Sequence, residues 1–139
     1  MEIFAYGTLR DAEYQQALFD RVLPARPAKL PGWLAVVADG GFLTLVRAPG
    51  ETVTGDLVTV DDDALALADA WEEVPLYERL GIQARTADGG SAPAYVYVRP
   101  SASRERAPAG MLARHARDEV LTRIRAFRRD YDRTSSESA

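Results

Sequence analysis

Two Asp-Gly-Gly triplets, at residues 39–41 and 88–90, each separate two short apolar segments of the chain. Glycine adopts the backbone conformations that a tight turn between antiparallel strands requires. The flanking segments are 33–37 and 42–46 for the first triplet, and 77–85 and 93–98 for the second. The sequence therefore predicts two β-hairpins, and with them a fold rich in antiparallel strands.

Two further apolar segments, 3–6 and 53–60, predict strands that are each followed by a helix. The first helix is expected over 11–20, where apolar residues recur at helical spacing. The second is expected to begin at the three aspartates 61–63, because acidic side chains accept hydrogen bonds from the free N–H groups of a first turn. Pro75 cannot continue this helix, which should end near Glu72 or Glu73.

The rest of the chain predicts one proline-rich segment and one long helix. Pro24, Pro27 and Pro31 predict an irregular or edge-like segment. A last helix is expected from about Pro108, with His115 on its polar part and its arginines on a solvated face. Its apolar stripe consists of Val120, Leu121, Ile124, Phe127 and Tyr131.

These elements predict an α+β fold, a small mixed β-barrel with flanking helices. A chain of 139 residues fits one core, so we expect a single domain over 1–133. The polar segment 134–139 is expected to be a disordered tail.

Composition excludes several classes of chemistry. The chain has no cysteine, which removes disulfides, thiolate metal sites and cysteine nucleophiles, and His115 is its only histidine. A net charge of −4 weighs against a nucleic-acid partner. The uncharged stretch 30–38 is far shorter than a membrane span, and no signal-peptide pattern opens the chain. We therefore expect a cytoplasmic protein with neither metal nor cofactor and with no nucleic-acid or membrane partner; the oligomeric state is not indicated.

Two segments contain candidate binding or catalytic residues. The turn Tyr6-Gly7-Thr8-Leu9 ends the first strand, and its glycine lets backbone N–H groups approach an anionic ligand. The segment from Asp69 to Arg79 places Glu72 and Glu73 at a helix end. Taken separately, the first is equally an ordinary strand-to-helix turn and the second a pair of solvated acids.

Together these segments resemble the γ-glutamyl cyclotransferase-like family, which includes the γ-glutamylamine cyclotransferases and the AIG2-like proteins. The matching motifs, in the family's order, are Tyr6-Gly7-Thr8-Leu9, Val53-Thr54-Gly55-Asp56-Leu57, Asp69-Ala70-Trp71-Glu72 and Tyr77-Glu78-Arg79. The resemblance implies a small barrel with a pocket at its mouth, a γ-glutamyl substrate, and Glu72 as the catalytic residue. Such an enzyme cleaves a γ-glutamyl amide to 5-oxoproline and a free amine.

The sequence departs from the family pattern at three places. Ala68 replaces a leucine, Glu73 replaces a residue that is often glycine, and the loop after Arg10 lacks the usual asparagine and histidine. The two adjacent acids leave it open whether the catalytic register shifts to Glu73. The changed loop leaves the identity of the substrate open.

The implied reaction suits the composition, because the substrate's own α-amine attacks its γ-carbonyl and no serine, cysteine or metal is required. Proton transfer remains, and burial at the negative end of a helix is expected to raise the pKa of Glu72 to about 6–7. By helical geometry Glu73 should face solvent.

Binding of the substrate is expected to involve residues on both motifs. Backbone N–H groups of Gly7, Thr8 and Leu9 are the candidate donors to the substrate's α-carboxylate, with Arg10 or Arg79 as the alternative. Tyr6, Tyr77 and Arg79 are further candidate substrate-binding residues, with core packing as the alternative for the tyrosines. For Arg79 the alternative is an ion pair with Asp69. Two other functions stay open: a non-catalytic small-molecule-binding module, and a biosynthetic enzyme of the same fold acting on another substrate.

Overall fold

The computed structural model describes residues 1–73, 77–108 and 110–138. The elements follow in the order β1 (Glu2–Ala5), η1 (Thr8–Arg10), α1 (Ala12–Phe19), β2 (Ala25–Val37), η2 (Asp39–Gly41), β3 (Leu43–Thr59), α2 (Asp62–Trp71), β4 (Glu78–Thr86), β5 (Ser91–Val98) and α3 (Arg117–Ser138). The two η elements are single turns of 3-10 helix.

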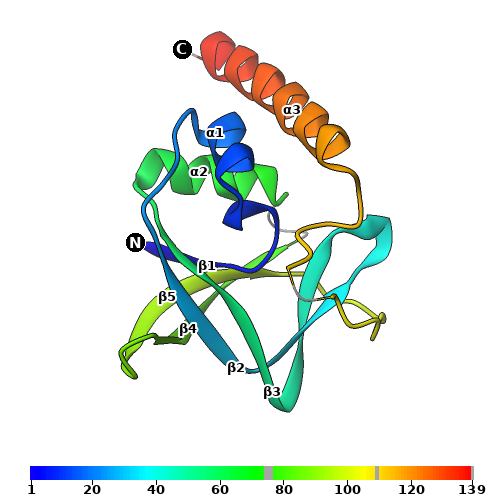
Figure 1. Cartoon of the computed structure of the whole chain (residues 1–139). Coiled ribbons are helices and arrows are strands. Elements are labelled where there is room, and N and C mark those ends of the chain that lie inside the picture. Colours follow the sequence, from blue (N-terminus) through cyan, green and yellow to red (C-terminus); the bar gives the residue numbers. More distant parts are fainter. Residues whose placement is uncertain (74–76, 109, 139) are drawn as a thin grey trace.

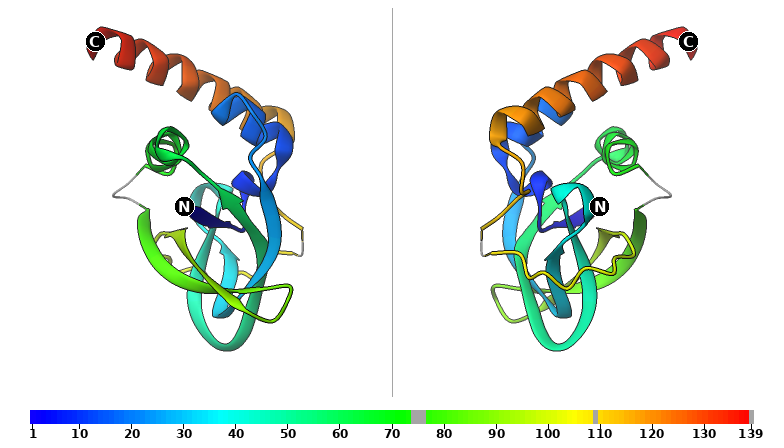
Figure 2. Two further views of the ribbon diagram at one scale, coloured as in Figure 1. Left: turned by 90° about the vertical axis from the view of Figure 1, so that its left-hand side faces the viewer. Right: turned by 90° about the vertical axis from the view of Figure 1, so that its right-hand side faces the viewer.

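The strands of the described ranges form a closed barrel in the order β1-β3-β2-β4-β5. Strands β1 and β5 run parallel where Ile3 pairs with Tyr95, and the other neighbours are antiparallel. The three α-helices lie together on one side of the barrel (Figure 1). Figure 2 shows α3 reaching beyond the barrel at its C-terminal end. The expected α+β fold, a small mixed β-barrel with flanking helices, is confirmed.

The core has two parts, which meet at β1. Ile3 and Ala5 belong to the cluster between the barrel and the helices, whereas Phe4 belongs to the cluster inside the barrel. Successive side chains of a strand point to opposite faces. A strand segment that is covered on both faces must therefore be apolar, as Ile3, Phe4 and Ala5 are.

The two shorter helices begin as their sequences predict. The carboxylate of Asp11 accepts hydrogen bonds from the N–H groups of Glu13 and Tyr14, and that of Asp61 accepts one from Ala64. Helix α2 ends at Trp71 with Glu72 as its C-terminal cap. Pro75, which predicts this end, lies outside the described residues.

The proline-rich segment forms most of β2, so the prediction of an irregular backbone there is wrong. Its edge-like character explains the prolines, because β2 pairs with β4 only at Ala28 and Lys29. A strand with one largely free side tolerates residues that lack an N–H group. The pairing with β3 shifts register between Pro31 and Trp33, at Gly32.

Strand β3 joins two segments that the sequence predicts as separate strands. It runs without a break through 47–52 and pairs with β2 on both sides of the register shift. The two apolar segments of β3 are thus the two halves of one long hairpin arm. The residues between these two segments lie at the register shift with β2 and do not form a turn between two strands.

The last helix begins at Arg117 rather than near Pro108. The preceding segment contacts the first hairpin instead, through bridges from Arg106 to Val36 and from Ala113 to Phe42. His115 is therefore not on the helix, and its Nε2 contacts the carbonyl oxygen of Gly40.

Helix α3 continues to Ser138, so the segment expected to be a disordered tail is helical as far as that residue. No glycine or proline follows Gly110 to interrupt it. Among the described residues, no helix is long and apolar enough to span a membrane.

Candidate active site

A cavity of about 240 Å³ opens between the end of β1, the end of α2 and the start of β3. Both motif-bearing segments contribute to it, together with residues from the loop before α3 and from α3 itself. Its lining comprises Ile3, Phe4, Ala5, Tyr6, Gly7, Thr8, Leu9, Phe42, Leu43, Trp71, Glu72, Glu73, Tyr77, Tyr97, Arg99, Leu112 and Arg123. The fold thus brings Tyr6, Gly7, Thr8, Leu9, Glu72 and Tyr77 together.

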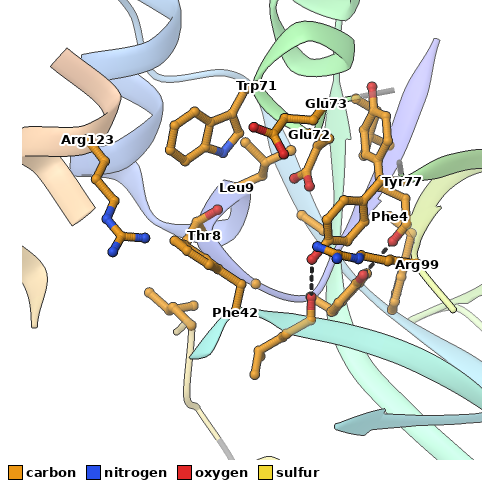
Figure 3. Close-up of a pocket in the computed structure, with 17 residues that line it drawn as sticks. Phe4, Thr8, Leu9, Phe42, Trp71, Glu72, Glu73, Tyr77, Arg99 and Arg123 are labelled. Carbon is orange, nitrogen blue, oxygen red and sulfur yellow. Dashed lines mark hydrogen bonds between the residues drawn. The ribbon is translucent and has the colours of Figure 1, made fainter. Parts of the chain in front are cut away.

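Glu72 lies where α2 ends, and its carboxylate points into this cavity (Figure 3). Its backbone N–H donates to the carbonyl oxygen of Ala68, and that of Glu73 donates to the carbonyl oxygen of Ala70, which holds both residues against the last helical turn. Within the described ranges no donor forms a hydrogen bond to the carboxylate. Burial raises the pKa of Glu72 to about 8, and the charge of Glu73 adds to the shift. This pKa lies above the expected range of about 6–7, so most of the Glu72 carboxyl groups carry a proton at neutral pH.

Glu73 is exposed, and it also lines the cavity, which the expectation from helical geometry does not include. The residue has a φ of 54°, in the left-handed region that glycine occupies most easily. The turn explains why a glycine suits this position. It also turns the Glu73 side chain back toward the cavity, so that two carboxyl groups share one end of it.

The raised pKa of Glu72 predicts a pH-dependent stability. Between about pH 4.5 and pH 8 the folded protein holds a proton on Glu72 that the unfolded chain releases, so this group lowers the free energy of unfolding as the pH rises. Glu72→Gln removes the effect. We expect the variant to match the parent near pH 4 and to exceed it by about 2–4 kcal/mol at pH 9. Urea unfolding at both pH values measures this, and an equal difference at both would contradict the buried carboxyl.

The turn after β1 forms the wall opposite Glu72. The Tyr6 hydroxyl donates to the carbonyl oxygen of Tyr97, which fixes the strand end against β5. Gly7 caps η1, and Thr8 and Leu9 are buried. The first N–H groups of any helical turn lack an acceptor within that turn. Among the backbone hydrogen bonds outside the regular elements of the described ranges, none is donated by the N–H groups of Gly7, Thr8 and Leu9, which border the cavity.

Both tyrosines of the motifs are neutral hydrogen-bond donors. Burial raises the pKa of Tyr77 to about 12, and its hydroxyl lies 3.4 Å from the carbonyl oxygen of Leu43. Burial, followed by the charge of Glu72, also raises the pKa of Tyr6 well above its usual value. Since each hydroxyl contacts a backbone carbonyl, the two rings shape the cavity wall.

Arg79 is not part of the cavity lining. Its guanidinium lies 2.5 Å from the Asp69 carboxylate and stacks over the ring of Tyr95. The other oxygen of Asp69 accepts a hydrogen bond of 2.6 Å from the Tyr97 hydroxyl. Arg79 and Asp69 thus fasten β4 and β5 to α2, the element that carries Glu72. The ion pair that the sequence leaves open as the alternative role for Arg79 is the one present.

Sequence reasoning missed two arginines that line the cavity. Arg99 follows β5, and its backbone N–H donates to the Thr44 hydroxyl, which in turn donates to the Arg99 carbonyl oxygen. Arg123 comes from α3, where its neighbours in sequence predict only a solvated face. Neither belongs to a motif, and only the fold reveals their position. No group of three or more acidic or histidine side chains within the described ranges is arranged to hold a metal ion.

The family model for gamma-glutamyl cyclotransferase, AIG2-like, matches residues 3–116. The chain belongs to this family. The matched range contains every motif residue of the cavity and ends one residue before α3. Family and fold together support an enzyme of the γ-glutamyl cyclotransferase kind. No curated protein matched the sequence.

Solved structures agree with the fold of the gamma-glutamyl cyclotransferase, AIG2-like family. An AIG2-like protein from Mus musculus is 23% identical, with a TM-score of 0.61 over 84% of this chain and 96% of that one. At5g39720.1 from Arabidopsis thaliana is 22% identical, with a TM-score of 0.64 over 96% and 86% of the two chains. A gamma-glutamyl cyclotransferase is 16% identical, with a TM-score of 0.60 over 73% and 67%. At these identities the likeness concerns the fold.

Proposed function

We propose that this protein cleaves a γ-glutamyl amide to 5-oxoproline and a free amine, with Glu72 as general base and then general acid. The observation that carries the proposal is the carboxyl group of Glu72 inside the cavity, opposite the turn formed by Tyr6 to Leu9. Its pKa of about 8 is close to the value of about 8 for an α-amino group. Proton exchange between the two groups is therefore nearly balanced in free energy.

The reaction begins from the ionised form of Glu72, whose carboxylate takes a proton from the substrate's α-ammonium group. The freed amine attacks the γ-carbonyl carbon, forming the ring C–N bond while the carbonyl electron pair moves to oxygen. As that pair returns, the C–N bond to the leaving amine breaks, and the protonated Glu72 gives its proton to the departing nitrogen. The ring nitrogen still carries two hydrogens at this point, and Glu72 passes one of them to the amine, which leaves as an ammonium ion. The products are 5-oxoproline and the amine, and Glu72 is again ionised. Because the nucleophile is tethered to the carbonyl, correct orientation supplies much of the rate, about 7–11 kcal/mol in favourable intramolecular reactions.

The substrate's α-carboxylate needs donors near Glu72. Backbone N–H groups of Gly7, Thr8 and Leu9 fill this role in the proposal, since they border the cavity and have no acceptor within η1. The arginines nearest to the two motifs are already paired: Arg10 lies 3.0 Å from Asp56, and Arg79 binds Asp69. Tyr6 and Tyr77 close the sides of the cavity around the γ-glutamyl chain.

Purified protein should release 5-oxoproline from γ-glutamyl amides of small amines, as measured by chromatography and mass spectrometry. A panel that varies only the amine identifies the preferred leaving group. Release of glutamate instead of 5-oxoproline would overturn the proposal in favour of hydrolysis. Turnover of no member of the panel, with tight binding of the intact amides, would favour a binding module.

Glu73→Gln should move the acidic limb of the pH–rate profile to lower pH. The substitution removes a negative charge that helps to raise the pKa of Glu72, so Glu72 ionises more readily. Burial is the larger cause of the shift and remains. The maximal rate should stay within about threefold of the parent, because Glu73 transfers no proton in the proposed reaction. A profile of kcat/KM from pH 5 to 10 measures both, and loss of activity at every pH would transfer the role of Glu72 to Glu73.

A further inference from the structure

Helix α3 adds a cation to the cavity from outside the part of the chain that the family model matches. The match ends at residue 116, and α3 begins at Arg117. Arg123, two turns along the helix, nevertheless lines the cavity, and its guanidinium lies 5.3 Å from the centre of the Phe42 ring. A feature that the family model does not include thus reaches the candidate active site.

Two other arginines of α3 form ion pairs with carboxylates of the protein. Arg117 binds Asp11 and Glu13, and Arg128 binds Asp20 and Asp132. Arg123 differs, because its one hydrogen bond within the described ranges is a long contact of 3.3 Å to Glu119, one turn earlier. Its side chain is 45% exposed. Most of its N–H donors therefore remain free for an anion that enters the cavity.

The two arginines that line the cavity lie on different sides of the Glu72 carboxylate. Figure 3 shows Arg123 on one side of the Glu72 carboxylate, beyond Trp71 and Thr8, and Arg99 on the other side. Arg99 lies within the matched range, as do the turn and the acids that the proposed function uses for the γ-glutamyl group. The γ-glutamyl group is common to all substrates of such a reaction, whereas the amine varies. The end of the cavity that α3 completes is therefore suited to the variable part of the substrate.

We propose that Arg123 selects the leaving amine by binding an anionic group on it, with Phe42 and Trp71 on either side of the amine's carbon chain. This inference rests on the proposed function and adds a substrate class to it: γ-glutamyl amides whose amine carries a carboxylate or a similar anion. A guanidinium binds such a group through two parallel charge-assisted hydrogen bonds. The Glu119 carboxylate lies 3.3 Å from the Arg123 guanidinium, on the preceding turn of α3.

The test compares two substrates that differ only in this anion, γ-glutamylalanine and γ-glutamylethylamine. The parent protein should prefer γ-glutamylalanine by about 10- to 100-fold in kcat/KM. Arg123→Gln should abolish this preference by slowing γ-glutamylalanine alone, while γ-glutamylethylamine stays within about twofold. Arg123→Glu should reverse the preference. Arg125→Gln, an exposed arginine on the same helix, is the matched control and should behave as the parent.

The outcomes separate this inference from the proposed function. If the parent releases 5-oxoproline from both substrates at equal rates, the assigned role of Arg123 is wrong and the proposed function stands. Equal losses on both substrates in Arg123→Gln would show a general effect on the site and would also overturn the inference. If the parent releases 5-oxoproline from neither substrate, nor from any other γ-glutamyl amide, both proposals fall. Thermal unfolding of each variant checks that the fold is intact.

Discussion

Glu72→Gln should lower the rate of 5-oxoproline release by about 10²–10⁴-fold, with little change in substrate affinity. The amide has nearly the same shape as the carboxyl group but neither takes a proton from the α-ammonium group nor returns one to the leaving nitrogen. The residual rate reflects the tethered attack of the small fraction of substrate whose amine is already neutral. That fraction grows with pH, so the residual rate should rise steadily toward high pH while the parent shows a maximum.

Two controls sharpen this result. Glu73→Gln carries the same chemical change one residue away and should retain the parent's maximal rate. Binding of 5-oxoproline to Glu72→Gln, measured by calorimetry, should persist because the backbone donors of the turn are untouched. Full activity of Glu72→Gln would exclude the proposed role of this residue.

Gly55→Ala should destabilise the fold by about 2–4 kcal/mol. Gly55 is the glycine of the motif Val53 to Leu57, and a Cβ there would lie 2.5 Å from the carbonyl oxygen of Ala5 and 2.7 Å from the Phe4 ring. The backbone oxygen belongs to β1 and has no freedom to move aside. Since Phe4 and Ala5 also line the cavity, the displaced strand should reduce activity as well.

Gly81→Ala is the matched control for this prediction. Gly81 is also a strand glycine, in β4, but a Cβ there would meet no atom within 4 Å. We expect a change of less than about 1 kcal/mol, toward higher stability, because alanine restricts the unfolded chain. Thermal and urea unfolding of both variants measure the contrast. Equal stabilities of the two variants would show that the close approach of β3 to β1 at Gly55 is not tight.

The strands and turns follow from local patterns, which explains why the barrel could be predicted from the sequence. Each Asp-Gly-Gly triplet links two strands, and the apolar run of β1 matches a strand buried on both faces. The start of the last helix could not be predicted, because the segment from 104 to 115 contacts β2 and the first turn through distant residues. Such contacts leave no local pattern. The prolines of β2 left an irregular segment and an edge-like strand both open for a similar reason, since only the barrel shows which side of a strand is free.

In the candidate site too, some residues could be predicted from local motifs and others depend on contacts between distant segments. Glu72 and the turn of Tyr6 to Leu9 are carried by short motifs, and the barrel brings them to one cavity. Arg79 stands in a motif too, but its partner is Asp69, ten residues earlier, so a residue can recur in a motif for structural reasons. Arg99 and Arg123 lie in no motif. Arg99 reaches the cavity because it follows the end of β5, and Arg123 reaches it because of where α3 begins. The spacing of residues in the sequence reveals neither position.

The most direct measurement of the central claim is a crystal structure of the Glu72→Gln variant with an uncleaved γ-glutamyl amide. The account predicts the α-amine within hydrogen-bond distance of the side chain at position 72, and the α-carboxylate on the N–H groups of Gly7 to Leu9. It also predicts the amine nitrogen at an angle and distance from the γ-carbonyl that permit ring closure. A ligand bound outside this cavity, or one whose amine faces away from position 72, would contradict the account.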